Sequence, residues 1–121
     1  MTRSRVALLM VAEPTTNAFS EVRGPIPEVL GALRNLRELL LSSNQLTDEI
    51  PATLGQLGNL QQLDLSWNKL SGFIPQELGN LNQLQTLWLY FNQLTGPIPE
   101  SLGALSNLRE LSLYSNRLTG S

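Results

Sequence analysis

The sequence contains no cysteine and no histidine. Without cysteine the chain can form no disulfide, no thiolate zinc site and no thiol nucleophile. Without histidine it lacks the commonest general base and the commonest metal ligand. We therefore expect no cofactor, no metal site and no catalytic residues, and we interpret the chain as a protein that is not an enzyme.

Excess positive charge and long hydrophobic runs are also missing. The net charge is −2 and the pI is near 5.0, whereas nucleic-acid binding requires a basic field. We expect no nucleic-acid partner. The longest uninterrupted apolar run, Val6–Ala12, is far shorter than the roughly 18 to 20 residues of a membrane-spanning helix, so no transmembrane span is predicted. Arg3 and Arg5 before this run resemble a minimal secretory signal, although Glu13-Pro14 is a poor cleavage site.

What the sequence does contain is a repeat. The frame Leu-x-x-Leu-x-Leu-x-x-Asn-x-Leu occurs four times at intervals of 24 residues. A fixed period in this range predicts a stacked solenoid rather than a closed globule. The four frames begin at Leu36, Leu60, Leu84 and Leu108, and their asparagines are Asn44, Asn68, Asn92 and Asn116.

The segments between the frames repeat as well, as Gly-x-Ile-Pro followed by Leu-Gly-x-Leu. Over Gly24–Gly120 this pattern resembles the plant-type leucine-rich repeat of receptor-like kinase ectodomains, receptor-like proteins and polygalacturonase inhibitors. The resemblance implies an α/β solenoid: a right-handed leucine-rich repeat superhelix of 24-residue repeats, with parallel strands on its concave side and short 3₁₀ or helical turns on its convex side. It also favours an extracellular or cell-surface location, while a cytoplasmic one stays open.

Residues 1–23 do not fit the frame when positions are counted back by 24 from the first repeat. The resembled family usually has a cysteine-paired cap here. We predict an irregular N-terminal segment at 1–23, which is either a weak cap, with Val6–Met10 as a possible pairing strand, or a signal-like stretch, or disordered. Residues 24–121 form an array of about four repeats, truncated in the last. Its uncapped end predicts fraying, self-association or a place inside a longer array.

Within each repeat the leucines should point inward and the residues between them outward, because side chains alternate along a strand. Strands are expected near Glu38–Ser42, Gln62–Ser66, Thr86–Tyr90 and Glu110–Tyr114. The asparagines should form a buried hydrogen-bonded ladder, and each Leu-Gly should end a short helical or 3₁₀ turn. Asp48 replaces the glycine of the other repeats and should adopt a left-handed turn conformation.

The outward columns form the predicted partner-binding face, which holds five of the seven aromatic residues. Alternation suggests that Trp88 and Tyr90 are its accessible aromatics, whereas Trp67 and Phe91 should pack partly against the neighbouring strand. No lysine or arginine falls in these columns, so a neutral or basic peptide should suit the face. The predicted binding residues are Glu38, Leu40, Gln62, Asp64, Trp67, Thr86, Trp88, Tyr90, Phe91, Glu110, Ser112 and Tyr114.

The leading functional hypothesis is a non-catalytic module that recognises a protein or peptide through this concave face, as part of or derived from a receptor-like protein. Two alternatives stay open. One is inhibition of a wall-degrading glycosidase, which the resemblance to polygalacturonase inhibitors implies. The other is a structural role in which the uncapped ends of the array stack copies of the chain together.

Overall fold

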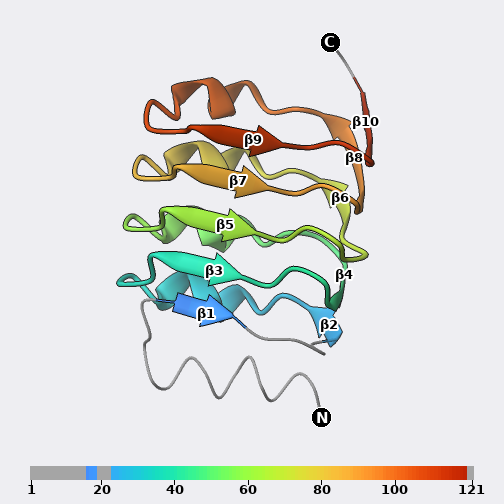
Figure 1. The fold of residues 1–121 in the computed structure, drawn as a ribbon, viewed down its shortest axis with the longest axis horizontal. Helices are drawn as coiled ribbons and strands as arrows, with labels where there is room; N and C mark the ends of the chain where they lie inside the picture. The colour runs from blue at the N-terminus through green and yellow to red at the C-terminus, as the bar shows by residue number, and fades with distance from the viewer. Residues whose placement is uncertain (1–15, 19–22, 120–121) are drawn as a thin grey trace.

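The computed structural model describes residues 16–18 and 23–119. These residues wind into a stack of coils, and each coil adds one strand to a parallel sheet of five (Figure 1). The predicted leucine-rich solenoid is confirmed. The five strands, in their order across the sheet, are β1 (Thr16–Ala18), β3 (Glu38–Leu40), β5 (Gln62–Asp64), β7 (Thr86–Trp88) and β9 (Glu110–Ser112).

The register of this sheet follows the 24-residue period. Leu63 pairs with Leu39 on one side and with Leu87 on the other, and all three side chains are fully buried. The strands are three residues long, shorter than the five expected, because the chain bends toward the asparagine after each strand. Backbone hydrogen bonds between coils nevertheless continue past the strand, as from the Leu65 N–H to the Trp88 carbonyl at 2.9 Å.

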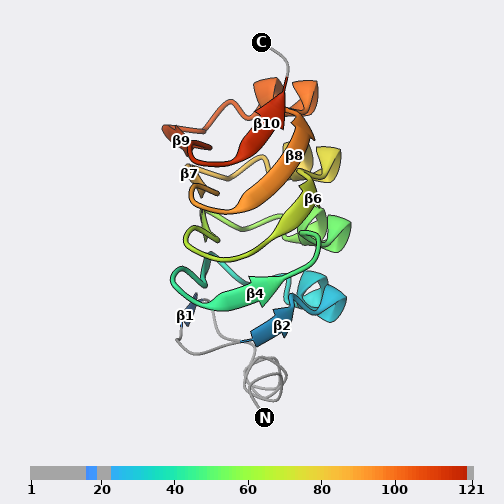
Figure 2. The same ribbon diagram turned by 90° about the vertical axis from the view of Figure 1, so that its right-hand side faces the viewer.

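A second series of short strands lies on one side of the coils (Figure 2). Sequence analysis did not predict them, because glycines and prolines within these segments disfavour strands. Backbone hydrogen bonds such as Lys69 N–H to Leu46 O, at 2.8 Å, join the sheet of β2 and β4 to that of β6, β8 and β10. The strands are β2 (Arg23–Pro25), β4 (Gln45–Thr47), β6 (Ser71–Phe73), β8 (Gln93–Pro97) and β10 (Arg117–Thr119).

The convex turns are 3₁₀ helices, as predicted, and each begins directly after a proline. They are η1 (Glu28–Ala32), η2 (Ala52–Gln56), η3 (Gln76–Asn80) and η4 (Glu100–Ala104). The expected ending at the glycine is wrong: each helix continues one residue past its glycine. The φ of these glycines is not positive. Three of them, Gly31, Gly55 and Gly79, instead allow close packing: a Cβ on Gly55 would lie 2.5 Å from the Glu77 carbonyl oxygen of the next coil.

The asparagine ladder is confirmed. The Asn68 side-chain amide donates to the carbonyl oxygens of Leu41, Leu65 and Ser66, each at 3.0 Å. Its Oδ1 accepts the Leu46 N–H at 3.1 Å. Asn92 and Asn116 repeat the two links to the preceding coil. Asn68, Asn92 and Asn116 therefore each satisfy backbone groups of their own coil and of the coil before it, beside a continuous core of buried leucines.

Asp48 has a φ of 65°, and its glycine counterparts Gly24, Gly72 and Gly96 have φ values of 87°, 76° and 77°. The predicted left-handed turn at Asp48 is thus confirmed. Aspartate is one of the few residues other than glycine that enter this region with modest strain.

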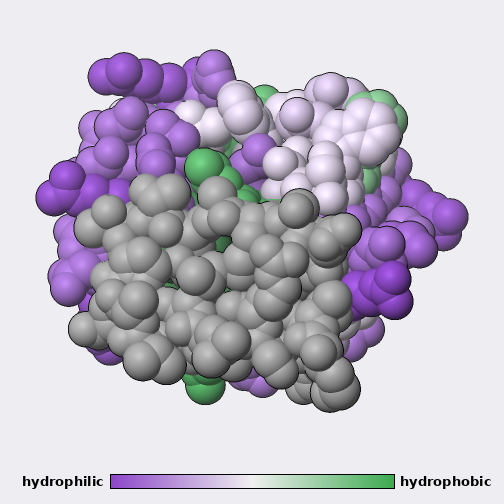
Figure 3. All heavy atoms as spheres, turned by 60° about the horizontal axis from the view of Figure 1, so that its bottom comes forward, coloured by the Kyte–Doolittle hydropathy of each residue, from purple (hydrophilic) through white to green (hydrophobic). Residues whose placement is uncertain are grey.

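The N-terminal strand β1 pairs Thr16 with Glu38. This offset is 22 positions, which explains why counting back by 24 found no repeat. The predicted pairing of Val6–Met10 lies outside the described residues, and so does most of the segment 1–23. The division of the chain at residue 23 therefore stays a prediction. From the N-terminal end, the flanks of the described array are mainly hydrophilic (Figure 3).

At the other end of the array, Leu111 is 46% exposed and Leu108, Leu113 and Leu118 are only partly buried. Among residues 16–18 and 23–119, no helix has the length and apolar character that a membrane crossing requires.

Candidate recognition surface on the concave face

The outward side of the five-stranded sheet, here called the concave face, carries the predicted binding residues in register. Glu38, Gln62, Thr86 and Glu110 align in one row across β3, β5, β7 and β9. Leu40, Asp64, Trp88 and Ser112 align in the next row. Most of these side chains are half-buried, while Trp67, Phe91, Glu110 and Tyr114 are exposed.

Five aromatic rings on this face form one connected cluster, called here the aromatic cluster: Trp67, Trp88, Tyr90, Phe91 and Tyr114. Trp67 and Phe91 stack with ring centroids 4.0 Å apart, and Tyr90 and Tyr114 stack at 4.9 Å. Phe91 meets the edge of Tyr114 at 5.4 Å and joins the two stacks. Trp88 contacts Tyr90 edge-on at 6.5 Å. Such pairs add roughly 0.5 to 1.5 kcal/mol each beyond the burial of their area.

The expected order of exposure within the cluster is wrong. Trp88 and Tyr90 are half-buried, whereas Trp67 is 52% exposed and Tyr114 57%. Strand alternation does not reach Trp67 and Phe91, because β5 and β7 end before them and both residues turn left-handed, with φ of 58° and 55°. The predicted packing of these two rings is present, but they stack on each other.

The left-handed position before each asparagine is the same in every coil. Ser43 and Ser115 occupy it in other coils with φ of 58° and 57°. Serine thus meets the backbone requirement of this position, and the large rings of Trp67 and Phe91 serve some other purpose than the turn. The exposure of Trp67 and Phe91 depends on the left-handed φ of this position. The repeat pattern does not encode that dihedral angle, so the sequence alone did not reveal it.

Asp64 lies beside Trp88 in the sheet register. Its Oδ1 accepts the Ser66 N–H at 3.1 Å and the Ser66 hydroxyl at 2.6 Å. Its Oδ2 has no hydrogen-bond partner among the described residues. Glu38 and Glu110 lie on the same face, one row away. The chemistry of this face is thus aromatic and anionic.

Sequence analysis missed one catalytic motif. Ser66 and Lys69 have the Ser-x-x-Lys spacing of class A β-lactamases and penicillin-binding proteins. The structure does not bring them together for catalysis. Ser66 is fully buried and its hydroxyl is bonded to Asp64, while Lys69 is exposed. Within residues 16–18 and 23–119, there is also no group of three or more acidic side chains placed to hold a metal ion.

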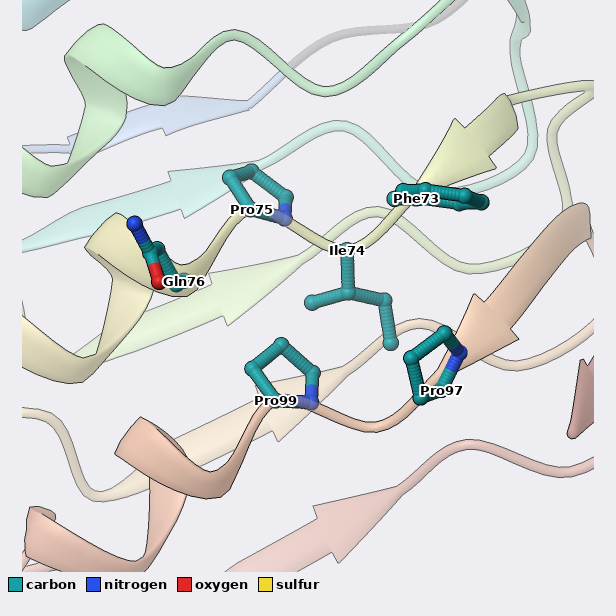
Figure 4. Close-up of a pocket in the computed structure, with 6 residues that line it drawn as sticks. All are labelled: Phe73, Ile74, Pro75, Gln76, Pro97 and Pro99. Atoms are coloured by element: carbon teal, nitrogen blue, oxygen red, sulfur yellow. The ribbon is translucent and has the colours of Figure 1, made fainter. Parts of the chain in front are cut away.

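A separate apolar pocket of about 320 Å³ lies between β6 and β8 and the segments that follow them (Figure 4). The Ile74 side chain points into it between Pro97 and Pro99, and the Phe73 ring stands at one end. Gln76 is the one polar side chain of its lining. Binding pockets of small molecules normally combine apolar walls with several converging polar groups, so this pocket is the weaker candidate.

Comparisons with protein families and with solved structures found similar proteins. A family model described as a leucine-rich repeat region matches residues 20–120. Among solved structures, the chain is similar to the BIR3–SERK2 complex from Arabidopsis thaliana, at 41% identity and a TM-score of 0.78, over 84% of this chain and 55% of that chain. A search of curated protein sequences found no match.

Two longer receptors from the same search are similar over most of this chain. The ectodomain of the receptor kinase GASSHO1/SCHENGEN3 from Arabidopsis thaliana, in complex with CASPARIAN STRIP INTEGRITY FACTOR 2, matches at 44% identity and a TM-score of 0.84, over 87% of this chain and 13% of that chain. The plant peptide hormone receptor RGFR1, in complex with RGF2, matches at 41% and 0.81, over 83% and 16%. The chain thus spans between 13% and 55% of these relatives.

The family match covers most of the chain, and the buried leucine layers and the asparagine ladder supply the physical basis for it. The chain belongs to the plant-type leucine-rich repeat family.

Proposed function

We propose that the chain is a non-catalytic recognition module that binds a protein or peptide segment through the concave face. The observation that carries the proposal is the aromatic cluster, in which five rings touch one another while three of them remain at least 36% exposed. Aromatic residues are enriched among the residues that dominate binding energy at interfaces. An exposed apolar cluster of this kind also costs solubility, and burial against a partner removes that cost.

The relatives support the class of partner. RGFR1 is described as a peptide hormone receptor, and GASSHO1/SCHENGEN3 as a membrane receptor kinase with a leucine-rich repeat ectodomain. This likeness supports the proposal of a location at the cell surface or outside the cell, with a peptide or a receptor-like protein as the partner. The activities of the whole receptors are not carried over, because this chain spans only part of each.

The size of the face limits the affinity. Five strands at roughly 4.8 Å spacing make a strip about 20 Å long, while a standard stable interface needs about 800 Å² on each partner. We therefore expect this chain alone to bind weakly, with dissociation faster than that of a full receptor.

The test uses substitutions that other repeats already contain. Trp67→Ser copies Ser43 and Ser115, which have the same left-handed backbone, and Trp88→Ser copies Ser112 of the same row. Linear random peptides displayed on phage are selected on the parent chain and then measured on both variants. We expect a loss of binding of tenfold or more, typical of truncated aromatic anchors, and a smaller loss of stability for Trp67→Ser than for Trp88→Ser.

Phe73→Glu is the matched control. Phe73 is 65% exposed but lies in β6, away from the concave face, in the sheet of β6, β8 and β10. Glu49 holds its position in another repeat. Equal loss of binding in Phe73→Glu and Trp67→Ser would mean non-specific hydrophobic attachment. A failure to enrich any peptide would overturn the proposal. Self-association through the ends stays a prediction, which light scattering over a concentration series tests.

A further inference from the structure

The charges on the concave face have one sign. Glu38, Asp64 and Glu110 lie in the two aligned rows, and no lysine or arginine occupies those rows. Cationic side chains flank the strands: Arg37 precedes β3, Arg109 precedes β9, and Lys69 follows Asn68. None of the three forms an ion pair with Asp64 in the part of the chain that the structure describes. A ligand that is cationic would therefore meet attraction here, and an anionic one repulsion.

The aromatic rings are arranged so that flat surfaces remain open. Trp67 and Phe91 cover one face of each other in a stack at 4.0 Å with an interplanar angle of 17°. The 52% exposure of Trp67 therefore belongs to its outer face and its edges. An aromatic face attracts a cation placed within about 6 Å of the ring centroid, and tryptophan attracts it best.

Asp64 adds a hydrogen-bond acceptor beside Trp88, another ring of the aromatic cluster. Both contacts from Ser66 go to Oδ1 and fix the carboxylate in place, which leaves Oδ2 open in the described part of the chain. Trp88 is its neighbour in the sheet. A ligand group that stacks on the indole and donates a hydrogen bond to the neighbouring Asp64 carboxylate would use both features.

We propose that the peptide bound by the concave face presents an arginine side chain, whose guanidinium stacks on the aromatic cluster and donates hydrogen bonds to Asp64. This inference rests on the proposed function and specifies its ligand. The guanidinium is planar, always charged and rich in donors in its own plane, so it can stack and hydrogen-bond at once. A lysine ammonium offers no plane to stack, and a neutral aromatic residue donates no hydrogen bond to the Oδ2 of Asp64.

The experiment uses two phage libraries of linear random peptides, one complete and one without arginine and lysine codons. The best binder of the complete library is then synthesised in two forms, with arginine and with citrulline, its neutral analogue of nearly the same shape. Asp64→Asn removes the charge but keeps an Oδ1 acceptor for Ser66. Glu110→Gln serves as a second variant at an exposed position, and Glu100→Gln, on the convex helix η4, makes the same change of charge away from the face.

We expect the complete library to yield arginine-containing binders and citrulline to weaken them about tenfold. Asp64→Asn should weaken the arginine peptide but not the citrulline peptide, and Glu100→Gln should change neither. Binders of equal affinity from the library without cations, sensitive to Trp67→Ser, would overturn the arginine inference and leave the proposed function standing. The absence of binders from both libraries would overturn both.

Discussion

Gly55→Ala and Gly103→Ala make the same chemical change at the same place in two coils. Both glycines are the fourth residue of a five-residue 3₁₀ helix, in η2 and η4 respectively, and neither has a positive φ. Their surroundings differ. A Cβ on Gly55 would lie 2.5 Å from the Glu77 carbonyl oxygen and 2.8 Å from the Glu77 Cβ, whereas a Cβ on Gly103 would meet nothing within 4 Å.

The magnitudes follow from these distances. To accept alanine at position 55, η2 and η3 must separate by several tenths of an ångström, and overpacking of this kind costs about 1 to 3 kcal/mol. Replacing glycine by alanine where the backbone permits it returns about 0.4 to 1 kcal/mol, because the unfolded chain loses freedom. We therefore expect Gly55→Ala to lose about 1 to 2 kcal/mol of unfolding free energy and Gly103→Ala to gain a few tenths to one.

The assay is urea unfolding at 25 °C followed by circular dichroism, with a thermal melt beside it. The difference between the two variants should reach about 1 to 3 kcal/mol, at unchanged m-values, and separate their thermal midpoints by roughly 5 to 20 °C. If both variants are as stable as the parent, the argument from close packing is refuted. If both lose the same amount of stability, it is refuted as well, and the backbone of the helix itself requires glycine.

Two further predictions concern the ladder and the turns. Asn68→Ala should lower the unfolding free energy by about 1 to 3 kcal/mol, because the Leu46 N–H loses its acceptor in a buried place; an unchanged urea midpoint would contradict the ladder. Asp48→Gly should raise stability by roughly 0.5 to 1 kcal/mol by relieving a φ of 65°, while Glu49→Gly, next to it, should lower it; the urea midpoints of the two variants give the order.

Much of the fold could be predicted from the sequence, because a 24-residue frame ties each residue to its counterpart in the next coil. The rows of the concave face, the buried asparagines and the left-handed Asp48 all follow from asking which residue fills one place in every repeat. The physics behind these predictions is local to one strand or one turn. It needs no knowledge of how far apart the coils lie.

The features that could not be predicted depend on more than one repeat or on a single backbone angle. The role of Gly55 depends on the position of Glu77 in the next coil, which no pattern within one repeat reveals. The strand β1 was missed because its offset to β3 departs from the period. The exposure of Trp67 depends on a backbone that leaves the strand. Each of these needs the spatial relation between coils or the dihedral of a single residue.

Trp67→Ser is the variant that best separates recognition from folding. The substitution keeps the left-handed position that Ser43 fills at a φ of 58°, equal to that of Trp67. It removes one stacked pair, worth about 0.5 to 1.5 kcal/mol, from a side chain that is 52% exposed. The unfolding free energy should therefore fall by that amount plus the contribution of the partly buried indole area, and by less than the roughly 3 to 5 kcal/mol of a truncated core aromatic.

The measurements are the urea midpoint of Trp67→Ser and its affinity for the selected peptide, set beside those of Trp88→Ser. Trp88 is half-buried and touches Tyr90 edge-on, so its loss should affect stability more. If Trp67→Ser loses stability by 3 kcal/mol or more, in the range of truncated core aromatics, and still binds the peptide like the parent, then Trp67 belongs to the core. The aromatic cluster would then stabilise the fold rather than bind a partner, because its most exposed indole would contribute to stability and not to affinity.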